Sequence, residues 1–208
     1  KHGNSLITSA DLKDQQVTTE QLFNIVPFDW NTVNDGNKFD VILGNPPYVK
    51  TEDMHALETD TEFSIYKDKY QTAYKQFDKY FLFIEQALRL LKPGGTLSYI
   101  VPNKFIKIDA GQELRRLLAP KIRALDDFGD MQLFPDKTIY SAILLCGNEA
   151  CDQMRYTNVT SLAELWTGKE QKYLSVANDS LGAAPWRLST DIAFLKMIAK
   201  MEAHARPL

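Results

Sequence analysis

The chain has 208 residues, of which 44% are hydrophobic and 25% are charged, as in ordinary soluble globular proteins. It contains no continuous apolar stretch of about eighteen residues and opens without a signal peptide, so we expect a cytoplasmic protein rather than a membrane-spanning or secreted one. The net charge of −3 gives no overall basic footprint for nucleic acid.

In the first 38 residues the sequence predicts short elements. Thr19–Ile25 has a helical pattern, and Trp30 follows in a loop, where packing is favoured over ring stacking. The segment 34–37, Asn-Asp-Gly-Asn, is a turn signal just before a strand.

The strand that organises the chain is predicted at Asp40–Leu43, as a central strand of its sheet. Gly44 permits an unusual backbone turn there, and Pro46 and Pro47 prevent the strand from continuing. Asn45 and Tyr48 should therefore lie at its carboxyl end, where open α/β sheets bind ligands.

The residues after this strand offer two acceptors and one flat ring. The acceptors are the Asn45 side-chain oxygen and the Pro46 carbonyl oxygen, and the ring is that of Tyr48. This set suits a planar group that carries an NH2. The alternative is a strand-ending turn in which Asn45 caps a neighbouring backbone group.

The polar segment that follows, up to about Phe77, has two interpretations. It interleaves aromatic and basic residues: Tyr66, Lys67, Lys69, Tyr70, Tyr74 and Lys75. These could contact a nucleic-acid strand, or the segment could form two short solvated helices. A later basic set, which faces either phosphates or solvent, comprises Lys104, Lys107, Arg115, Arg116, Lys121 and Arg123.

The next elements alternate between helix and strand. A helix is predicted at 78–91, with Asp78 as its N-cap or first-turn acid. It is followed by a strand at 96–101, a helix at 109–118, and two strands at 122–129 and 138–146. The alternation predicts an α/β fold with a parallel sheet. The last two strands leave no room for a crossover helix, so we expect a terminal antiparallel hairpin. Beyond Asn148 the patterns weaken, until a helix at Asp191–Met201.

The segment Asn45-Pro46-Pro47-Tyr48 resembles the catalytic motif of amino-methyltransferases that use S-adenosylmethionine. From about Lys1 to about Cys146, the chain resembles the N6-adenine DNA methyltransferases of restriction-modification systems, especially the single-chain type II enzymes. The resemblance implies a Rossmann-like methyltransferase sheet, S-adenosyl-L-methionine as cofactor, double-stranded DNA with a flipped adenine as partner, and a possible restriction domain in the same parent chain.

Site residues follow from the resemblance position by position. The implied catalytic residues are Asn45, Pro46, Pro47, Tyr48 and, on the other face of the base, Phe134. The implied cofactor-binding residues are Asn4, Ser5, Leu6, Asn45 and Phe83. No metal is implied, and Cys146 and Cys151 lack companions for a metal site or disulfide, so we interpret both as structural.

The glycine-rich cofactor loop of the family is not found in the sequence, since the one glycine pair, Gly94-Gly95, follows a helix. We therefore expect a fragment that is inactive in isolation. Residues 1–148 would be a partial catalytic domain that lacks its amino-terminal cofactor strands, and 149–208 a linker towards a target-recognition domain.

Two rival functions stay open. Methyltransferases that act on a protein glutamine or on RNA share the Asn-Pro-Pro-Tyr tip, although the long segment after Tyr48 favours DNA. A non-catalytic methyltransferase-like module that binds DNA is the other rival. Methylation of a ring carbon is disfavoured, because no cysteine follows a proline.

Overall fold

The computed structural model describes residues 2–13, 17–134, 139–167 and 172–204. The strands are β1 (Phe39–Gly44), β2 (Leu91–Pro102), β3 (Ile122–Gln132), β4 (Tyr140–Gly147), β5 (Gln153–Asn158) and β6 (Tyr173–Ala177). The α-helices are α1 (Thr19–Ile25), α2 (Thr51–Leu57), α3 (Asp60–Lys69), α4 (Lys79–Leu90), α5 (Gln112–Leu118), α6 (Leu162–Trp166) and α7 (Ile192–His204).

The six strands form one mixed sheet in the order β1-β2-β4-β3-β5-β6. β1 and β2 are parallel, and β4 runs antiparallel to both β2 and β3. The carboxyl ends of β1, β2 and β3 therefore lie at the same edge of the sheet. The predicted α/β sheet with an antiparallel hairpin is confirmed, and α1 spans the predicted residues.

β5 and β6 extend this sheet beyond the hairpin, although no strand is predicted there. β5 pairs parallel to β3, and β6 pairs antiparallel to β5. They have six and five residues, and such short strands carry a weak sequence pattern. The domain boundary at residue 148 stays a prediction, but the sheet itself continues past it.

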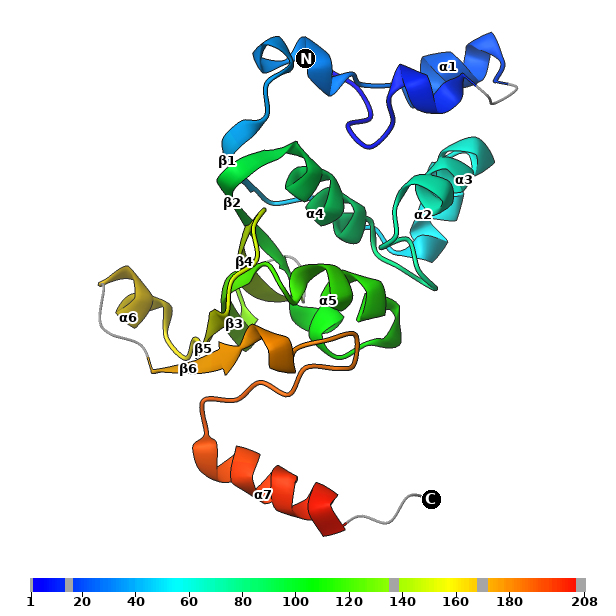
Figure 1. The fold of residues 1–208 in the computed structure, drawn as a ribbon. Helices are drawn as coiled ribbons and strands as arrows, with labels where there is room; N and C mark the ends of the chain where they lie inside the picture. The colour runs from blue at the N-terminus through cyan, green and yellow to red at the C-terminus, as the bar shows by residue number, and fades with distance from the viewer. Residues whose placement is uncertain (1, 14–16, 135–138, 168–171, 205–208) are drawn as a thin grey trace.

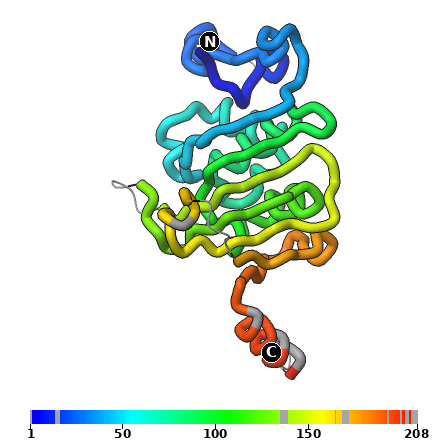
Figure 2. The backbone as a smooth tube through the Cα atoms, turned by 90° about the vertical axis from the view of Figure 1, so that its left-hand side faces the viewer, coloured from blue at the N-terminus to red at the C-terminus, as the bar shows by residue number. Residues whose placement is uncertain are grey.

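The main helices cover one face of the sheet. Figure 1 shows α4 and α5 on one side, and Figure 2 looks onto the opposite side, where the strands lie in front of them. Leu97, Leu125 and Leu144 point into the covered face and are completely buried. α7 lies below this body in Figure 1.

One expectation about the organising strand is wrong. Among the described strands β1 lies at one end of the sheet order, and Val41 and Leu43 are 56% and 72% exposed. Gly44 does not make an unusual turn, because it ends β1 in pairing with Tyr99 and has no positive φ. A Cβ at Gly44 would lie 3.1 Å from Cε1 of Tyr99, so the glycine gives room to that ring.

The segment after Tyr48 forms two short helices, α2 and α3, as one of the two interpretations expects. Tyr66 and Tyr70 are buried in the core, so their rings are not displayed for a nucleic-acid strand. The ammonium group of Lys67 donates to the carbonyl oxygen of Ala73, and Lys69 pairs with Asp11. The alternation of aromatic and basic residues therefore mostly serves packing.

Candidate active site

The motif loop, residues 45–48, is fixed at both ends at the carboxyl edge of the sheet. On one side Gly44 pairs with Tyr99 of β2. On the other side the N–H of Val49 donates to Asp78 Oδ1 at 3.1 Å, and the Val49 carbonyl accepts from the Lys79 N–H at 2.9 Å. Between these anchors Pro46 is buried, so the loop is held without being part of a helix or strand.

Within the loop, Tyr48 and Asn45 contact each other. The Tyr48 hydroxyl lies within hydrogen-bond distance of both Asn45 Oδ1 and the Ile100 carbonyl oxygen, the latter at 2.8 Å. Asn45 is exposed and Tyr48 is half-buried. Burial, with a smaller contribution from the Asp78 charge, raises the pKa of Tyr48 to about 12. The hydroxyl therefore keeps its proton at neutral pH and can donate it either to Asn45 Oδ1 or to the Ile100 carbonyl oxygen.

Phe134 lies just after β3, in the connection to β4, and is half-buried. Because β3 and β1 are parallel, this connection lies at the same edge of the sheet as the motif loop. The predicted placement of Phe134 opposite the Tyr48 ring stays a prediction. The next residues, Pro135 and Asp136, lie outside the described residues.

A cavity of about 320 Å³ lies between β1, α4 and the amino-terminal segment, and we call it the aromatic cavity. Two of the predicted cofactor residues, Ser5 and Phe83, line it together. The remaining lining residues are Trp30, Phe39, Val41, Ile42, Leu43, Gln86, Ala87, Leu90 and Tyr99. Leu43 stands two residues before Asn45, so the cavity and the motif loop are separated by about 7 Å of strand.

The other two predicted cofactor residues at the amino terminus have their groups engaged within the chain. The Asn4 amide donates to Glu62 Oε1 and to the Tyr66 hydroxyl, both at 2.9 Å. Leu6 is completely buried, and its carbonyl accepts from Tyr70 at 2.7 Å. This network holds the amino-terminal segment against α3 and leaves Ser5 as the member of the three that lines the cavity.

Sequence reasoning missed the roles of Asp78 and Lys104. Asp78 is placed as the N-cap of α4, but its side chain makes no capping hydrogen bond there. Its carboxylate instead binds the Val49 N–H and the ammonium of Lys104, at 2.8 Å. An acidic residue before a helix is so common that the sequence carried no signal for this second role.

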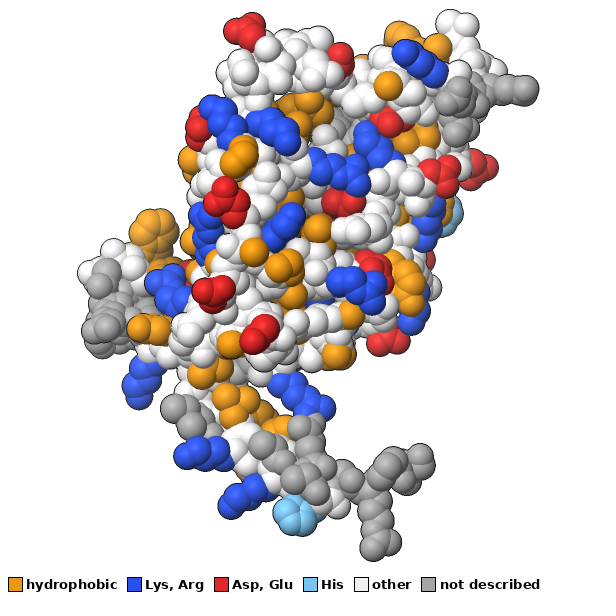
Figure 3. Space-filling model, in the orientation of Figure 1, with side chains coloured by type: hydrophobic (Ala, Val, Ile, Leu, Met, Phe, Trp, Pro, Cys, Tyr) orange, Lys and Arg blue, Asp and Glu red, His pale blue; other side chains and the backbone are white. Residues whose placement is uncertain are grey.

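Charges are mixed over the surface. On the face drawn in Figure 3, basic and acidic side chains are interspersed among the described residues. Arg115, from the predicted basic set, is buried and donates to the carbonyl oxygens of Phe105 and Ile108. Arg116 pairs with Glu113. The set therefore does not act as one phosphate-facing surface.

The remaining reactive groups fit structural roles. Cys146 is buried, and burial raises the pKa of its thiol. The Cys151 thiol donates to the Ile122 carbonyl oxygen at 3.1 Å. Among the described residues no cluster of three metal-ligating side chains occurs. In the same part of the chain, every helix is too short or too polar to cross a bilayer.

The fold and the motif loop together define an α/β protein with a mixed sheet and Asn-Pro-Pro-Tyr at the carboxyl end of a strand. The modification subunit of a putative type I restriction enzyme from Vibrio vulnificus has the same fold, with a TM-score of 0.56 and 16% identity over 80% of this chain and 41% of its own. The type IIG restriction endonuclease BpuSI matches with a TM-score of 0.51 and 16% identity, over 76% of this chain and 22% of its own.

Sequence comparison gives the family. Residues 2–134 match the family described as Eco57I restriction-modification methylase, and the chain belongs to it. The type II restriction enzyme and methyltransferase RM.Eco57I of Escherichia coli is 44% identical over 195 residues, which are 91% of this chain and 18% of the relative. The type II methyltransferase M.PaeR7I of Pseudomonas aeruginosa is 31% identical over 74% of this chain and 29% of its own length. The chain thus spans less than a third of either relative.

Proposed function

We propose that the chain carries the catalytic motif of an enzyme that transfers a methyl group from S-adenosylmethionine to the N6 amine of adenine in DNA, as part of a restriction-modification enzyme. The observation that carries the proposal is the motif loop. It places an exposed, oriented Asn45 at the carboxyl edge of a methyltransferase-type sheet, next to an aromatic cavity.

The acceptors of the motif loop suit an exocyclic amine. A side-chain amide oxygen has two lone pairs, so Asn45 Oδ1 can accept from the Tyr48 hydroxyl and still accept one N–H of the amine. The Pro46 carbonyl oxygen would accept the second N–H. With both hydrogens held, the nitrogen lone pair points away from the acceptors, and no general base is required beforehand. This is catalysis by positioning and electrostatic preorganisation.

The aromatic cavity suits the cofactor by its chemistry. Its walls are aromatic and aliphatic, with Ser5 and Gln86 as polar groups, a set that can hold a flat heteroaromatic ring and bind its edge. Phe83 and Ser5 would hold the adenine ring of S-adenosylmethionine, which supplies an electrophilic methyl group on a sulfonium. The short distance along β1 from this cavity to Asn45 supports transfer between the two sites.

A base within a duplex must leave the stack to reach Asn45, at a cost of a few kcal/mol. Stacking on an aromatic side chain returns about 1–3 kcal/mol per base. The ring of Tyr48 would supply one such contact, and Phe134 the other.

The experiment that tests the proposal is methylation by the whole protein with radiolabelled S-adenosylmethionine. Unmethylated DNA, total RNA and a protein mixture are offered in parallel, and the labelled nucleosides are separated. We expect label in N6-methyladenine of DNA. Label in RNA or in protein glutamine would instead indicate an RNA or protein methyltransferase. DNA binding without any methyl transfer would indicate a non-catalytic DNA-binding module.

A further inference from the structure

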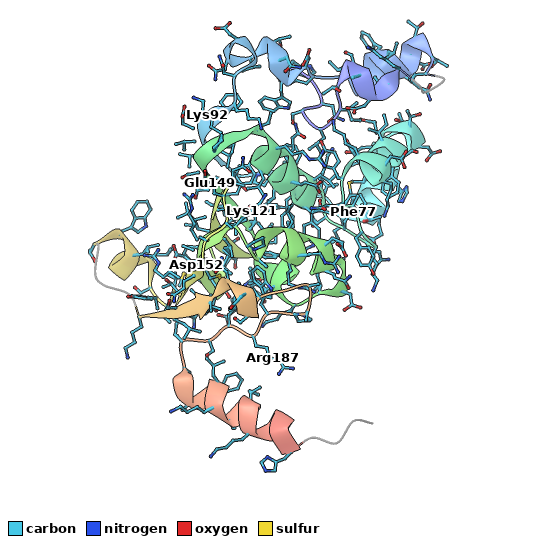
Figure 4. All side chains as sticks on the ribbon, in the orientation of Figure 1. Phe77, Lys92, Lys121, Glu149, Asp152 and Arg187 are labelled. Carbon is cyan, nitrogen blue, oxygen red and sulfur yellow. The ribbon has the colours of Figure 1, made fainter. Side chains whose placement is uncertain are left out.

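Asp78 occupies an unusual position for an acidic side chain. It immediately precedes α4, and its side chain is only 4% exposed. Figure 4 labels the preceding residue, Phe77, between α4 and the pair α2 and α3. The carboxylate is therefore inside the protein, at the point where the chain passes from these two helices to α4.

One oxygen of this carboxylate anchors the residue that follows the motif loop. Asp78 Oδ1 accepts from the Val49 N–H at 3.1 Å, while the next residue, Lys79, donates its N–H to the Val49 carbonyl at 2.9 Å. The Thr51 hydroxyl also donates to the Phe77 carbonyl, at 2.6 Å. Both backbone polar groups of Val49 are thus tied to the beginning of α4.

The other oxygen connects to the neighbouring strand. Asp78 Oδ2 lies 2.8 Å from the ammonium nitrogen of Lys104, which follows the end of β2. Tyr48 rests on the same strand, through its hydrogen bond to the Ile100 carbonyl. A single carboxylate therefore joins the motif loop, the first turn of α4 and the end of β2.

We propose that Asp78 and Lys104 form a positioning pair that fixes the motif loop for methyl transfer. The inference rests on the proposed function for its catalytic consequence, but its geometric part concerns the loop alone. A buried carboxylate is retained only where its partners are well placed. Here those partners are Val49, which follows the motif loop, and Lys104, which lies two residues beyond the end of β2. The pair therefore sets the position of Asn45 and Pro46 without touching the substrate.

The test uses charge-neutral variants of similar shape in the whole protein. Asp78→Asn has one acceptor oxygen in place of two, and the Lys104 ammonium attracts that oxygen, so the NH2 group faces the Val49 N–H and the Val49 amide loses its acceptor. The double variant Asp78→Asn/Lys104→Gln restores a donor and an acceptor facing each other without charge. Asp40→Asn is the matched control, since Asp40 pairs with Lys92 at 2.8 Å on the exposed side of β1, and both side chains are exposed.

The expected results separate positioning from stability. A displacement of the loop by about 1 Å should lower kcat roughly tenfold to a hundredfold in Asp78→Asn, with KM for S-adenosylmethionine within about twofold. The double variant should recover kcat to within about threefold of the parent. Asp40→Asn should leave kcat unchanged. Hydrogen exchange of the Val49 amide should be fast in Asp78→Asn and slow again in the double variant.

Three results would overturn the inference: an unchanged kcat in folded Asp78→Asn, a double variant as impaired as the single one, or slow exchange of the Val49 amide in Asp78→Asn. If Asp78→Asn does not fold, the single variant Lys104→Gln is measured instead, and an unchanged kcat in that variant would overturn the inference. The amide exchange needs no methylation. Slow exchange in Asp78→Asn therefore refutes the positioning pair even if the proposed function fails, and a missing activity in the parent protein refutes only the proposed function.

Discussion

The two parts of the Tyr48 side chain can be tested separately. Tyr48→Phe keeps the ring and removes the hydroxyl, which donates to the Ile100 carbonyl at 2.8 Å or to Asn45. One such hydrogen bond contributes about 0.5–1.5 kcal/mol to stability, which for a chain of this size lowers Tm by roughly 2–4 °C per kcal/mol. We expect Tyr48→Phe to melt a few degrees lower and to keep kcat/KM for DNA within about fivefold.

Tyr48→Ala removes the ring as well. Loss of a stacked aromatic costs about 1–3 kcal/mol in transition-state binding, which corresponds to a decrease in kcat/KM of about 5-fold to 150-fold. The assay is methyl transfer to a duplex that carries one target site, with Tm measured for each variant. If Tyr48→Phe is as impaired as Tyr48→Ala, or if Tyr48→Ala retains the parent kcat/KM, the assignment of Tyr48 as a stacking residue is refuted.

Three further predictions concern the surroundings of the loop. Gly44→Ala places a Cβ 3.1 Å from Cε1 of Tyr99, so the ring must shift by a few tenths of an ångström, and we expect the free energy of unfolding to fall by about 1 kcal/mol or less. Gly182→Ala meets no atom within 4 Å and should leave denaturant unfolding unchanged; equal effects would contradict this explanation. Phe83→Ala should weaken the affinity for S-adenosylmethionine about tenfold, as measured by calorimetry, and Phe83→Leu should weaken it less. An unchanged affinity in Phe83→Ala would show that Phe83 does not bind the cofactor. Burial raises the pKa of Tyr99 to about 12, against about 10 in the unfolded chain. The protonated Tyr99 therefore contributes up to about 2 kcal/mol to the free energy of unfolding below pH 10, and this contribution is lost between pH 10 and 12. Tyr99→Phe should reduce the loss of stability between pH 9 and pH 11 in urea unfolding, and the same pH dependence in both proteins would contradict this.

Most of the fold could be predicted from local patterns. Asp40–Leu43 and the strands at 96–101 and 138–146 carry β-branched and apolar runs. These three segments and the more polar one at 122–129 each lie within or overlap an observed strand. What the sequence did not reveal depends on contacts between distant segments. The addition of β5 and β6 to the sheet is decided by which strands pair, and pairing is not encoded in the pattern of one short strand.

The candidate site shows the same division. The sequence predicts Asn45 and Tyr48 as site residues because the two prolines give their surroundings a rare local signature. The aromatic cavity brings together Ser5, Phe83 and Tyr99, which are far apart in the sequence, and only the fold shows that they share it. The role of Gly44 was misjudged because a glycine that makes room for a ring looks, in sequence, like a glycine that makes a turn.

The most direct test of the central claim is methyl transfer by the whole protein and by its Asn45→Ala variant. Both are incubated with labelled S-adenosylmethionine and unmethylated duplex DNA, and the DNA is digested to nucleosides. We predict label in N6-methyladenine with the parent protein and a decrease of at least about a hundredfold with Asn45→Ala, at equal Tm and equal DNA binding. Transfer that survives Asn45→Ala unchanged, or label that appears in a nucleoside other than N6-methyladenine, would contradict the account.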